Sequence, residues 1–310
     1  MKAVRIHGRG GPEQLFVEDA PAPVVRLGDV LVRVRATGIT PTELTWDETY
    51  RNEDGSVRIP SIPGHEPSGV VEKTAPDVTD FRGGDEIYGL ADFPRDGAAA
   101  EFAAVPATNL ALKPRSISHV QAAALPLSAL TAWQALFEHA HLAEGQTVLI
   151  HGGAGGVGTL AVQLARWRGA RVIATASARD AALVRSLGAD DVIDYHGARF
   201  DDIVRDVDVV VDGVGGETRE RSWRVLRKGG VLVTLVSPIP ADVAEQHSVR
   251  GVFFIVSGNR SQLDQITALV DAGKLRPILS EVLPFARARE AFEYAGPGHA
   301  PGKIVLQVSD

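Results

Sequence analysis

The chain has 310 residues, of which 45% are hydrophobic, and its 32 lysines and arginines against 39 aspartates and glutamates give a net charge of −7. So much apolar sequence can fill the core of one large domain or two ordinary ones, which excludes an intrinsically disordered chain. The negative charge argues against a nucleic-acid partner, because binding to a phosphate backbone needs a basic surface. The chain has no cysteine, which excludes disulfides, a thiol nucleophile and every zinc site built on thiolate.

The sequence also argues against membrane insertion. The longest apolar stretch, Ala122 to Trp133, is interrupted by Pro126 and Ser128 and falls short of the ~20 residues of a membrane-spanning helix. The first residues, Met1 to His7, lack the apolar core of a signal peptide. We therefore expect no membrane partner and a location in the cytoplasm.

Residues 1–118 are predicted to form an all-β, barrel-like domain. Between Val30 and Ala36 the residues alternate with a period of two, which is typical of a half-buried strand. Further candidate strands are Lys2 to Ile6, Gly69 to Glu72, Asp85 to Gly89 and Glu101 to Val105. Residues 257–310 contain an amphipathic helix, a second helical segment and a closing strand, and we expect them to fold back onto this domain. These elements are Leu263 to Ala272, Arg287 to Tyr294 and Lys303 to Val308.

Residues 119–256 are predicted to form a doubly wound α/β domain. Short apolar strands alternate here with helices, and strands of this kind are buried on both faces of a parallel sheet. The strands are Thr147 to His151, Arg171 to Thr175, Val192 to Ile193, Val207 to Val211 and Val231 to Val236. An apolar edge strand, Val252 to Val256, predicts a homodimer joined through sheet edges.

The segment Gly153-Ala154-Gly155-Gly156-Val157-Gly158 has the spacing G-x-G-x-x-G and lies between a predicted strand and a predicted helix. In a dinucleotide-binding site, Gly153 permits the tight turn, Gly155 lets the backbone approach a pyrophosphate, and Gly158 lets the helix pack on the strand. The alternative is an ordinary glycine-rich turn. The run of alternating strands and helices that begins here favours dinucleotide binding.

The residues after the second strand of this domain decide between NADH and NADPH. Enzymes that use NAD usually place an acid at this strand end, where it binds the ribose hydroxyls. Here Ser177 can donate a hydrogen bond to a 2′-phosphate and Arg179 can neutralise its charge. Asp180 is the competing ribose acid, but it lies where we expect a helix N-cap. We therefore predict NADPH as the cofactor.

Several motifs in a fixed order run through nearly the whole chain. They are Gly64-His65-Glu66-Pro67-Ser68-Gly69, Phe81-Arg82-Gly83-Gly84-Asp85-Glu86-Ile87, Leu130-Thr131-Ala132-Trp133, the glycine segment, Leu187-Gly188-Ala189-Asp190 and Gly302-Lys303-Ile304-Val305-Leu306. With these motifs the chain resembles the zinc-free quinone oxidoreductase branch of the medium-chain dehydrogenase/reductase superfamily. The resemblance implies a GroES-like β-barrel catalytic domain, residues 1–118 and 257–310, and a Rossmann NADPH-binding domain, residues 119–256.

The resemblance also bears on metal binding. Alcohol dehydrogenases of this superfamily hold a catalytic zinc with a cysteine at the position of Thr40 and with the histidine at the position of His65. A hydroxyl is a poor replacement for thiolate, so we expect His65 and Glu66 to be structural residues and no metal to be bound. A zinc site built from His65, Glu66 and a distant third ligand is the alternative.

The resemblance suggests further cofactor contacts. It places Thr131 at the nicotinamide carboxamide, Tyr195 beside the adenosine phosphate, and Phe253 and Phe254 near the nicotinamide. Strand ends of such sheets bind ligands, which adds Val214, Gly215, Leu235 and Val236, and Lys303 is a candidate phosphate contact. Each has a structural alternative: a hydrogen bond within a helix for Thr131, a surface aromatic for Tyr195, an edge strand for the phenylalanines and a solvated lysine for Lys303.

Thr40 and Tyr50 are the candidates for donating a proton or hydrogen bond to the acceptor, and Trp46 is a candidate apolar wall for it. Quinone oxidoreductases usually carry asparagine at the Thr40 position, so the chain departs from its family there. The alternative for Tyr50 is a loop position without a catalytic role.

Without zinc to polarise a carbonyl, hydride transfer needs an electron-poor acceptor. We therefore expect NADPH-dependent reduction of a small-molecule quinone. The alternatives are reduction of an enoyl or α,β-unsaturated carbonyl substrate, and NADPH binding without catalysis.

Overall fold

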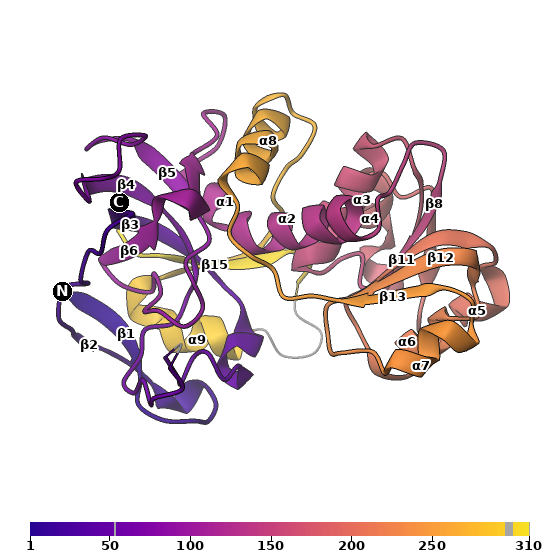
Figure 1. The fold of residues 1–310 in the computed structure, drawn as a ribbon, viewed down its shortest axis with the longest axis horizontal. Helices are drawn as coiled ribbons and strands as arrows, with labels where there is room; N and C mark the ends of the chain where they lie inside the picture. Colours follow the sequence, from indigo (N-terminus) through magenta and orange to yellow (C-terminus); the bar gives the residue numbers. More distant parts are fainter. Residues whose placement is uncertain (53, 295–299, 310) are drawn as a thin grey trace. The chain divides into compact units, whose positions relative to one another are not determined.

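The computed structural model describes residues 1–52, 54–294 and 300–309 (Figure 1). The chain divides into two compact units. Unit 1 comprises Met1–Leu130, Ser257–Gly273 and Pro277–Asp310, and unit 2 comprises Thr131–Val256 and Lys274–Arg276. The predicted fold class is confirmed: a β-rich unit accompanies a doubly wound parallel sheet.

Unit 1 is built on a seven-stranded sheet in the order β14-β15-β3-β4-β5-β7, with β6 also paired to β3, and on a separate pair, β1-β2. The strands are β1 (Lys2–Ile6), β2 (Leu15–Asp19), β3 (Asp29–Ile39), β4 (Glu66–Thr74), β5 (Glu86–Gly89), β6 (Phe102–Pro106), β7 (Leu110–Leu112), β14 (Leu279–Pro284) and β15 (Lys303–Gln307). The helices are α1 (His119–Ala123), α8 (Arg260–Asp271), α9 (Ala288–Glu293) and the start of α2 (Pro126–Trp133). The alternation that predicted β3 is confirmed, because Val30, Val32 and Val34 are fully buried in one cluster.

The register of β15 positions the site in unit 1. This strand comes from the end of the chain, yet it pairs antiparallel with β3, with Ile304 opposite Ile39 and Leu306 opposite Thr37 (Figure 1). The residue before Ile304 therefore lies beside the residue after Ile39. Lys303 and Thr40, which are 263 positions apart in sequence, become neighbours.

The boundary between the units lies at Leu130, later than residue 118, where the sequence placed it. The reason is that α1 packs against β3, β4 and β15. Ala123 and Ala124 are buried in one cluster with Ala36 and Val305. A short helix rich in alanine looks like the start of the α/β domain in sequence, but its small side chains fit closely against the sheet of unit 1.

Unit 2 is a six-stranded sheet in the order β10-β9-β8-β11-β12-β13, in which every neighbouring pair is parallel. Its strands are β8 (Thr147–Ile150), β9 (Arg171–Ala176), β10 (Asp191–Asp194), β11 (Val207–Asp212), β12 (Leu226–Thr234) and β13 (Arg250–Phe253). Its helices are α3 (Gly156–Trp167), α4 (Ala181–Ser186), α5 (Phe200–Ile203), α6 (Gly216–Ser222), α7 (Ala241–Gln246) and the π-helical turn Gln134–His139. In Figure 1, α3 and α4 lie on one side of the sheet and α6 and α7 on the other.

Because all six strands of unit 2 are parallel, their carboxyl ends lie along one edge of the sheet, where such folds bind ligands. The reversal of strand order falls between β8 and β11. The loop that follows β8 is the glycine segment singled out above. Within the described part of the chain, no helix has both the length and the apolarity to cross a membrane.

Candidate functional site

The glycine segment connects β8 to α3 by a turn that needs small residues at three points. Gly152 adopts a φ of 70°, so the left-handed backbone lies one residue before Gly153, the position to which the sequence assigned the tight turn. Gly153 nevertheless lies inside a tight turn, because the Gly155 N–H donates to the Gly152 carbonyl at 2.9 Å. Gly153 is also a close-packing position, because a Cβ there would lie 2.9 Å from the Cβ of Ala174 on β9. At Gly158 a Cβ would lie 2.0 Å from the Gly152 carbonyl oxygen, so helix and loop touch there.

The start of α3 has the features of a helix N-terminus that can bind an anion. The first amides of a helix have no acceptor within the helix. Gly155 occupies the N-cap position, no side chain caps the helix, and its first turn carries no acidic residue. The partial positive charge of the helix N-terminus is therefore not neutralised by the loop itself.

His151 lies directly behind this loop in a buried hydrogen-bond chain. Its Nε2 is 2.9 Å from Ser222 Oγ, which donates its own proton to the Thr218 carbonyl, so Nε2 must carry a hydrogen. Its Nδ1 is therefore the acceptor for the Thr175 hydroxyl at 3.2 Å, and that hydroxyl accepts the Gly152 N–H. Burial lowers the pKa of His151 to about 4. A neutral imidazole thus holds the first amide of the glycine loop in place.

The residues after β9 form a tight polar group. Ser177 Oγ donates to Asp180 Oδ2 at 2.7 Å, and Arg179 pairs with the same carboxylate at 3.2 Å. Asp180 does stand at the N-cap of α4, but its side chain makes no capping hydrogen bond. The expected N-cap position of Asp180 is therefore confirmed, although its carboxylate contacts Ser177 and Arg179 and does not cap the helix. The Arg179 side chain is 60% exposed and accessible to an anion.

Apolar side chains are exposed at the ends of the other strands. Tyr195 after β10 is 59% exposed, Val214 after β11 is 53% exposed and Val236 after β12 is 47% exposed. Leu235, Phe253 and Phe254 are half-buried at the same edge. Asp212, fully buried at the end of β11, shapes the next turn by accepting the N–H groups of Val214 and Gly215. An edge lined with exposed apolar groups suits the flat rings of a dinucleotide.

Thr131 lies in α2 and is buried, with 6% of its surface exposed. Its predicted contact with a nicotinamide carboxamide stays a prediction.

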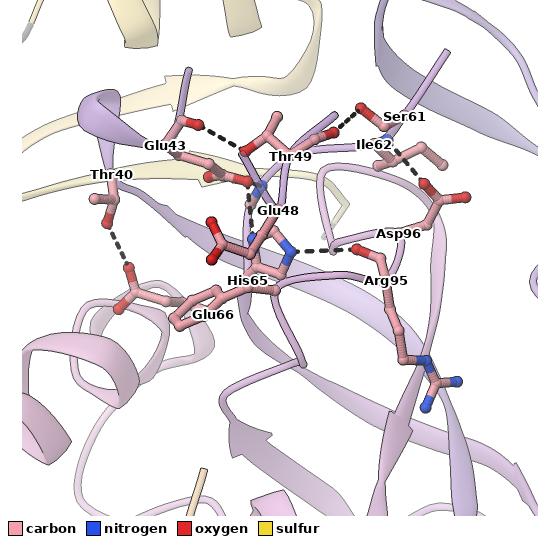
Figure 2. Close-up of polar contacts among 12 residues, drawn as sticks. Thr40, Glu43, Glu48, Thr49, Ser61, Ile62, His65, Glu66, Arg95 and Asp96 are labelled. Carbon is pink, nitrogen blue, oxygen red and sulfur yellow. Dashed lines mark hydrogen bonds and ion pairs between the residues drawn. The ribbon is translucent and has the colours of Figure 1, made fainter. Parts of the chain in front are cut away.

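A second polar cluster lies in unit 1, where β3 meets β15. Lys303 Nζ donates to Thr40 Oγ1 at 2.6 Å and forms an ion pair with Glu66 Oε1. Thr40 Oγ1 also lies 3.3 Å from Glu66 Oε1 (Figure 2). The side chains of Lys303 and Glu66 are only 8% and 1% exposed. Lys303 is therefore neither solvated nor free to bind a phosphate, which corrects both expectations for it.

Next to this cluster, His65 pairs with Glu43. His65 Nδ1 lies 2.8 Å from Glu43 Oε1 in an ion-pair contact, and Nε2 lies 3.3 Å from the Arg95 carbonyl (Figure 2). Glu43 also accepts the Gly64 N–H. Burial opposes a charge on His65, but the Glu43 carboxylate outweighs it and raises the pKa of His65 above its usual value.

These contacts do not fit a zinc ion. Both imidazole nitrogens of His65 face protein oxygens, and both carboxylate oxygens of Glu66 have partners, Lys303 on one side and the Leu127 N–H on the other. Among the described residues, no three histidine, aspartate or glutamate side chains are grouped as metal ligands would be. The predicted structural roles of His65 and Glu66 agree with this geometry.

Tyr50 is a core residue, which contradicts its predicted role as a proton donor. It is 2% exposed, and its hydroxyl donates to the Leu44 carbonyl at 2.6 Å. Burial raises its pKa above the usual value. Trp46 is half-buried and packs edge-on against Phe93 at 5.1 Å, so part of its ring remains available as an apolar surface.

Comparison with known proteins supports the same architecture. Residues 26–115 match the alcohol dehydrogenase GroES-like domain and residues 187–306 match the zinc-binding dehydrogenase family. The chain is 34% identical to human mitochondrial NAD(P)H oxidoreductase RTN4IP1, over 94% of this chain and 85% of the relative. It is 33% identical to 2-methylene-furan-3-one reductase of Solanum lycopersicum, over 99% and 79%. The structure of a quinone oxidoreductase from Coxiella burnetii superposes with a TM-score of 0.90 at 33% identity, covering 99% of each chain.

These relatives support an oxidoreductase that uses a nicotinamide cofactor. The chain belongs to the quinone oxidoreductase branch of the medium-chain dehydrogenase/reductase superfamily.

Proposed function

We propose that this protein is an NADPH-dependent reductase that delivers hydride directly to a quinone-type acceptor, without a metal ion. The observation that carries the proposal is the edge of the unit 2 sheet. There the uncapped start of α3, the exposed Arg179 and a row of exposed apolar side chains follow successive parallel strands. NADPH, when bound, supplies the hydride.

The preference for NADPH rests on Arg179. A 2′-phosphate adds two negative charges, and a guanidinium can bind it with two parallel hydrogen bonds. Arg179 has the exposure for this, and Ser177 lies beside it with a hydroxyl that can turn from Asp180 to a phosphate oxygen. Asp180 keeps Arg179 near the strand end in the free protein. These groups support NADPH over NADH.

The choice of acceptor follows from the cluster in unit 1. Both imidazole nitrogens of His65 and both carboxylate oxygens of Glu66 face protein groups, so these side chains are not arranged to hold a Lewis acid for an unactivated carbonyl. A quinone or a conjugated enone is already electron-poor and spreads the incoming charge onto an oxygen. Hydrogen-bond donors then suffice to stabilise the product anion.

A conjugated enone is the second candidate acceptor. The tomato relative is named for a 2-methylene-furan-3-one, in which an alkene is conjugated to a ketone. Enoyl thioesters belong to the same chemical class.

Initial rates of NADPH oxidation on a panel of 1,4-naphthoquinones, 2-enones and enoyl thioesters test the proposal, with NADH as a matched reductant. We expect turnover of at least one class, with a higher kcat/KM for NADPH. Tight NADPH binding by fluorescence without turnover of any acceptor would favour the non-catalytic alternative and contradict the proposal.

We also propose a homodimer formed through β13, which is the outer strand of the unit 2 sheet. Ile255, just beyond this strand, is 64% exposed, and an apolar sheet edge of this kind favours pairing with a second copy. Light scattering coupled to size exclusion tests this. A location in the cytoplasm stays a prediction, and the human relative is named as mitochondrial.

A further inference from the structure

The cluster of Thr40, Glu66 and Lys303, here called the Lys303 cluster, is more than a buried ion pair. An ion pair with this little exposure gains little stability over apolar packing, because both charges lose their hydration. The cluster is nevertheless fixed from several sides. Glu66 accepts the Leu127 N–H at 3.0 Å, and a Cβ on Gly38 would lie 2.8 Å from Glu66 Oε1, so a glycine there leaves room for the carboxylate.

The positions of the protons in the cluster follow from its chemistry. An ammonium group only donates, so Thr40 Oγ1 accepts a hydrogen bond from Lys303 at 2.6 Å. The Thr40 proton then points to Glu66 Oε1 at 3.3 Å, which is long for a hydrogen bond between oxygens. The threonine proton is therefore weakly held and can turn to a better acceptor.

The Thr40 hydroxyl does not cap the helical turn that follows it, as a threonine at an N-cap position usually does. It occupies the N-cap of the 3₁₀ turn Pro41–Thr45, yet its side chain makes no capping hydrogen bond. Its hydroxyl instead accepts from Lys303 Nζ, and Figure 2 shows it directed at the Glu66 carboxylate. Thr40 is half-buried, whereas Lys303 behind it is almost fully buried. Thr40 is thus the less buried end of a chain that begins at the ammonium.

We propose that Lys303, acting through Thr40, supplies the proton that completes reduction of a conjugated enone. This inference rests on the proposed function. Hydride adds to the β-carbon of the enone, and the electron pair of the alkene moves to give an enolate. The Thr40 hydroxyl gives its proton to the enolate, a proton passes from Lys303 Nζ to Thr40 Oγ1, and the neutral amine regains a proton from water.

The same cluster predicts a difference between the two acceptor classes. Hydride addition to a quinone yields a hydroquinone anion, a stable phenolate that can take its proton from water. An enolate is much more basic and gains more from a positioned acid. We call the transfer of a proton from Lys303 through Thr40 the relay. Its loss therefore affects enone reduction far more than quinone reduction. Thr40 is the catalytic residue in this scheme. Lys303 is a positioning residue, which orients the Thr40 hydroxyl and returns a proton to it.

The test compares Lys303→Met, Thr40→Val and Thr40→Ser with the wild type, using a 2-enone and a naphthoquinone. We expect Lys303→Met and Thr40→Val to lower kcat for the enone by about 100-fold or more and kcat for the quinone by a factor at least tenfold smaller. Thr40→Ser keeps the hydroxyl and should restore most of the enone rate. The solvent deuterium isotope effect on enone reduction should be larger in Lys303→Met than in the wild type, because protonation then limits the rate.

Lys113→Met is the matched control. Lys113 is another buried lysine of unit 1 paired with a carboxylate, that of Glu86. Its loss should leave the ratio of enone to quinone turnover as in the wild type. An equal fall of both activities in Lys303→Met, or a changed ratio in Lys113→Met, would overturn the relay.

Binding of an enolate analogue tests the relay independently of turnover, and so independently of the proposed function. The probe is 4-nitrophenolate, an oxyanion that stands in for the enolate, and its absorbance shift reports binding to the protein with NADP⁺. We expect Thr40→Val to weaken this binding about tenfold or more, since a hydrogen bond to a charged group is lost. Lys303→Met should also weaken it, because the Thr40 hydroxyl then loses the ammonium that polarises it. Unchanged binding would overturn the role of Lys303. A wild type that reduces quinones but no enone would overturn the inference alone, whereas a wild type that reduces neither would overturn the proposed function.

Discussion

Gly155 and Gly158 lie three residues apart in the glycine loop, and the structure predicts different consequences for an added methyl group at each. At Gly158 the new Cβ would stand 2.0 Å from the Gly152 carbonyl oxygen, a backbone atom that cannot rotate away. At Gly155 the only near atom is the same oxygen, at 3.3 Å. Gly158→Ala should therefore lower the stability of the fold, whereas Gly155→Ala should weaken binding of the cofactor.

The expected change in stability is the balance of two opposing effects, helix propensity and overpacking. Alanine inside a helix is favoured over glycine by about 1 kcal/mol, whereas overpacking costs up to about 3 kcal/mol. Gly158→Ala should thus lose about 2 kcal/mol of unfolding free energy, which lowers Tm by roughly 4–8 °C for a protein unit of this size. Gly155→Ala should change stability by less than about 0.5 kcal/mol. In the proposed binding mode its methyl group would approach the pyrophosphate, so NADPH binding should weaken by about 5- to 150-fold.

Calorimetry without ligand gives Tm, and quenching of protein fluorescence by NADPH gives Kd. Each variant serves as the control for the other, because both add one methyl group to the same loop. A Gly158→Ala protein that melts at or above the wild-type temperature would refute the packing argument. A Gly155→Ala protein with wild-type affinity for NADPH would refute the placement of the pyrophosphate.

Three other predictions concern His151, Tyr50 and Arg179. Because the folded-state pKa of His151 lies near 4, the unfolded chain binds the extra proton first as pH falls, so stability should drop between about pH 6.5 and pH 4 by roughly 3 kcal/mol. Urea unfolding across this range checks it, and a His151→Gln variant with the same slope would contradict it. Tyr50→Phe should lose about 1–2 kcal/mol of unfolding free energy with kcat retained, since the hydroxyl donates to Leu44; a large fall in kcat at unchanged stability would return Tyr50 to the mechanism. Arg179→Met should weaken NADPH binding about tenfold or more and leave NADH binding unaffected, and equal losses for both cofactors would show that Arg179 does not bind the 2′-phosphate.

His65 should show the opposite pH dependence from His151. Its pKa is raised by Glu43, so its contribution to stability is fully present below the unfolded pKa and is lost as pH rises through the folded one. The two buried histidines therefore limit stability at opposite ends of the pH range.

The sequence predicted those features that depend on local pattern. Alternation between Val30 and Ala36 identified β3, apolar runs identified the parallel strands, and the glycine spacing placed the loop at a strand end. Such signals are short-range, because side-chain direction and turn geometry are set by neighbouring residues.

The features missed from the sequence depend on contacts between distant segments. Lys303 meets Thr40 only because β15 pairs with β3 in one particular register. The hydroxyl of Tyr50 is engaged by a backbone carbonyl six residues away, which no residue pattern reveals. The close packing of Gly153 against Ala174 depends on the position of a different strand, β9.

The most direct test of metal-independent hydride delivery is NADPH-dependent turnover of the best acceptor before and after exhaustive chelation, with metal content measured on the same samples. The geometry around His65 and Glu66 predicts full activity in protein that holds far less than one metal ion per chain. Activity that disappears with the metal and returns with stoichiometric zinc would contradict the account.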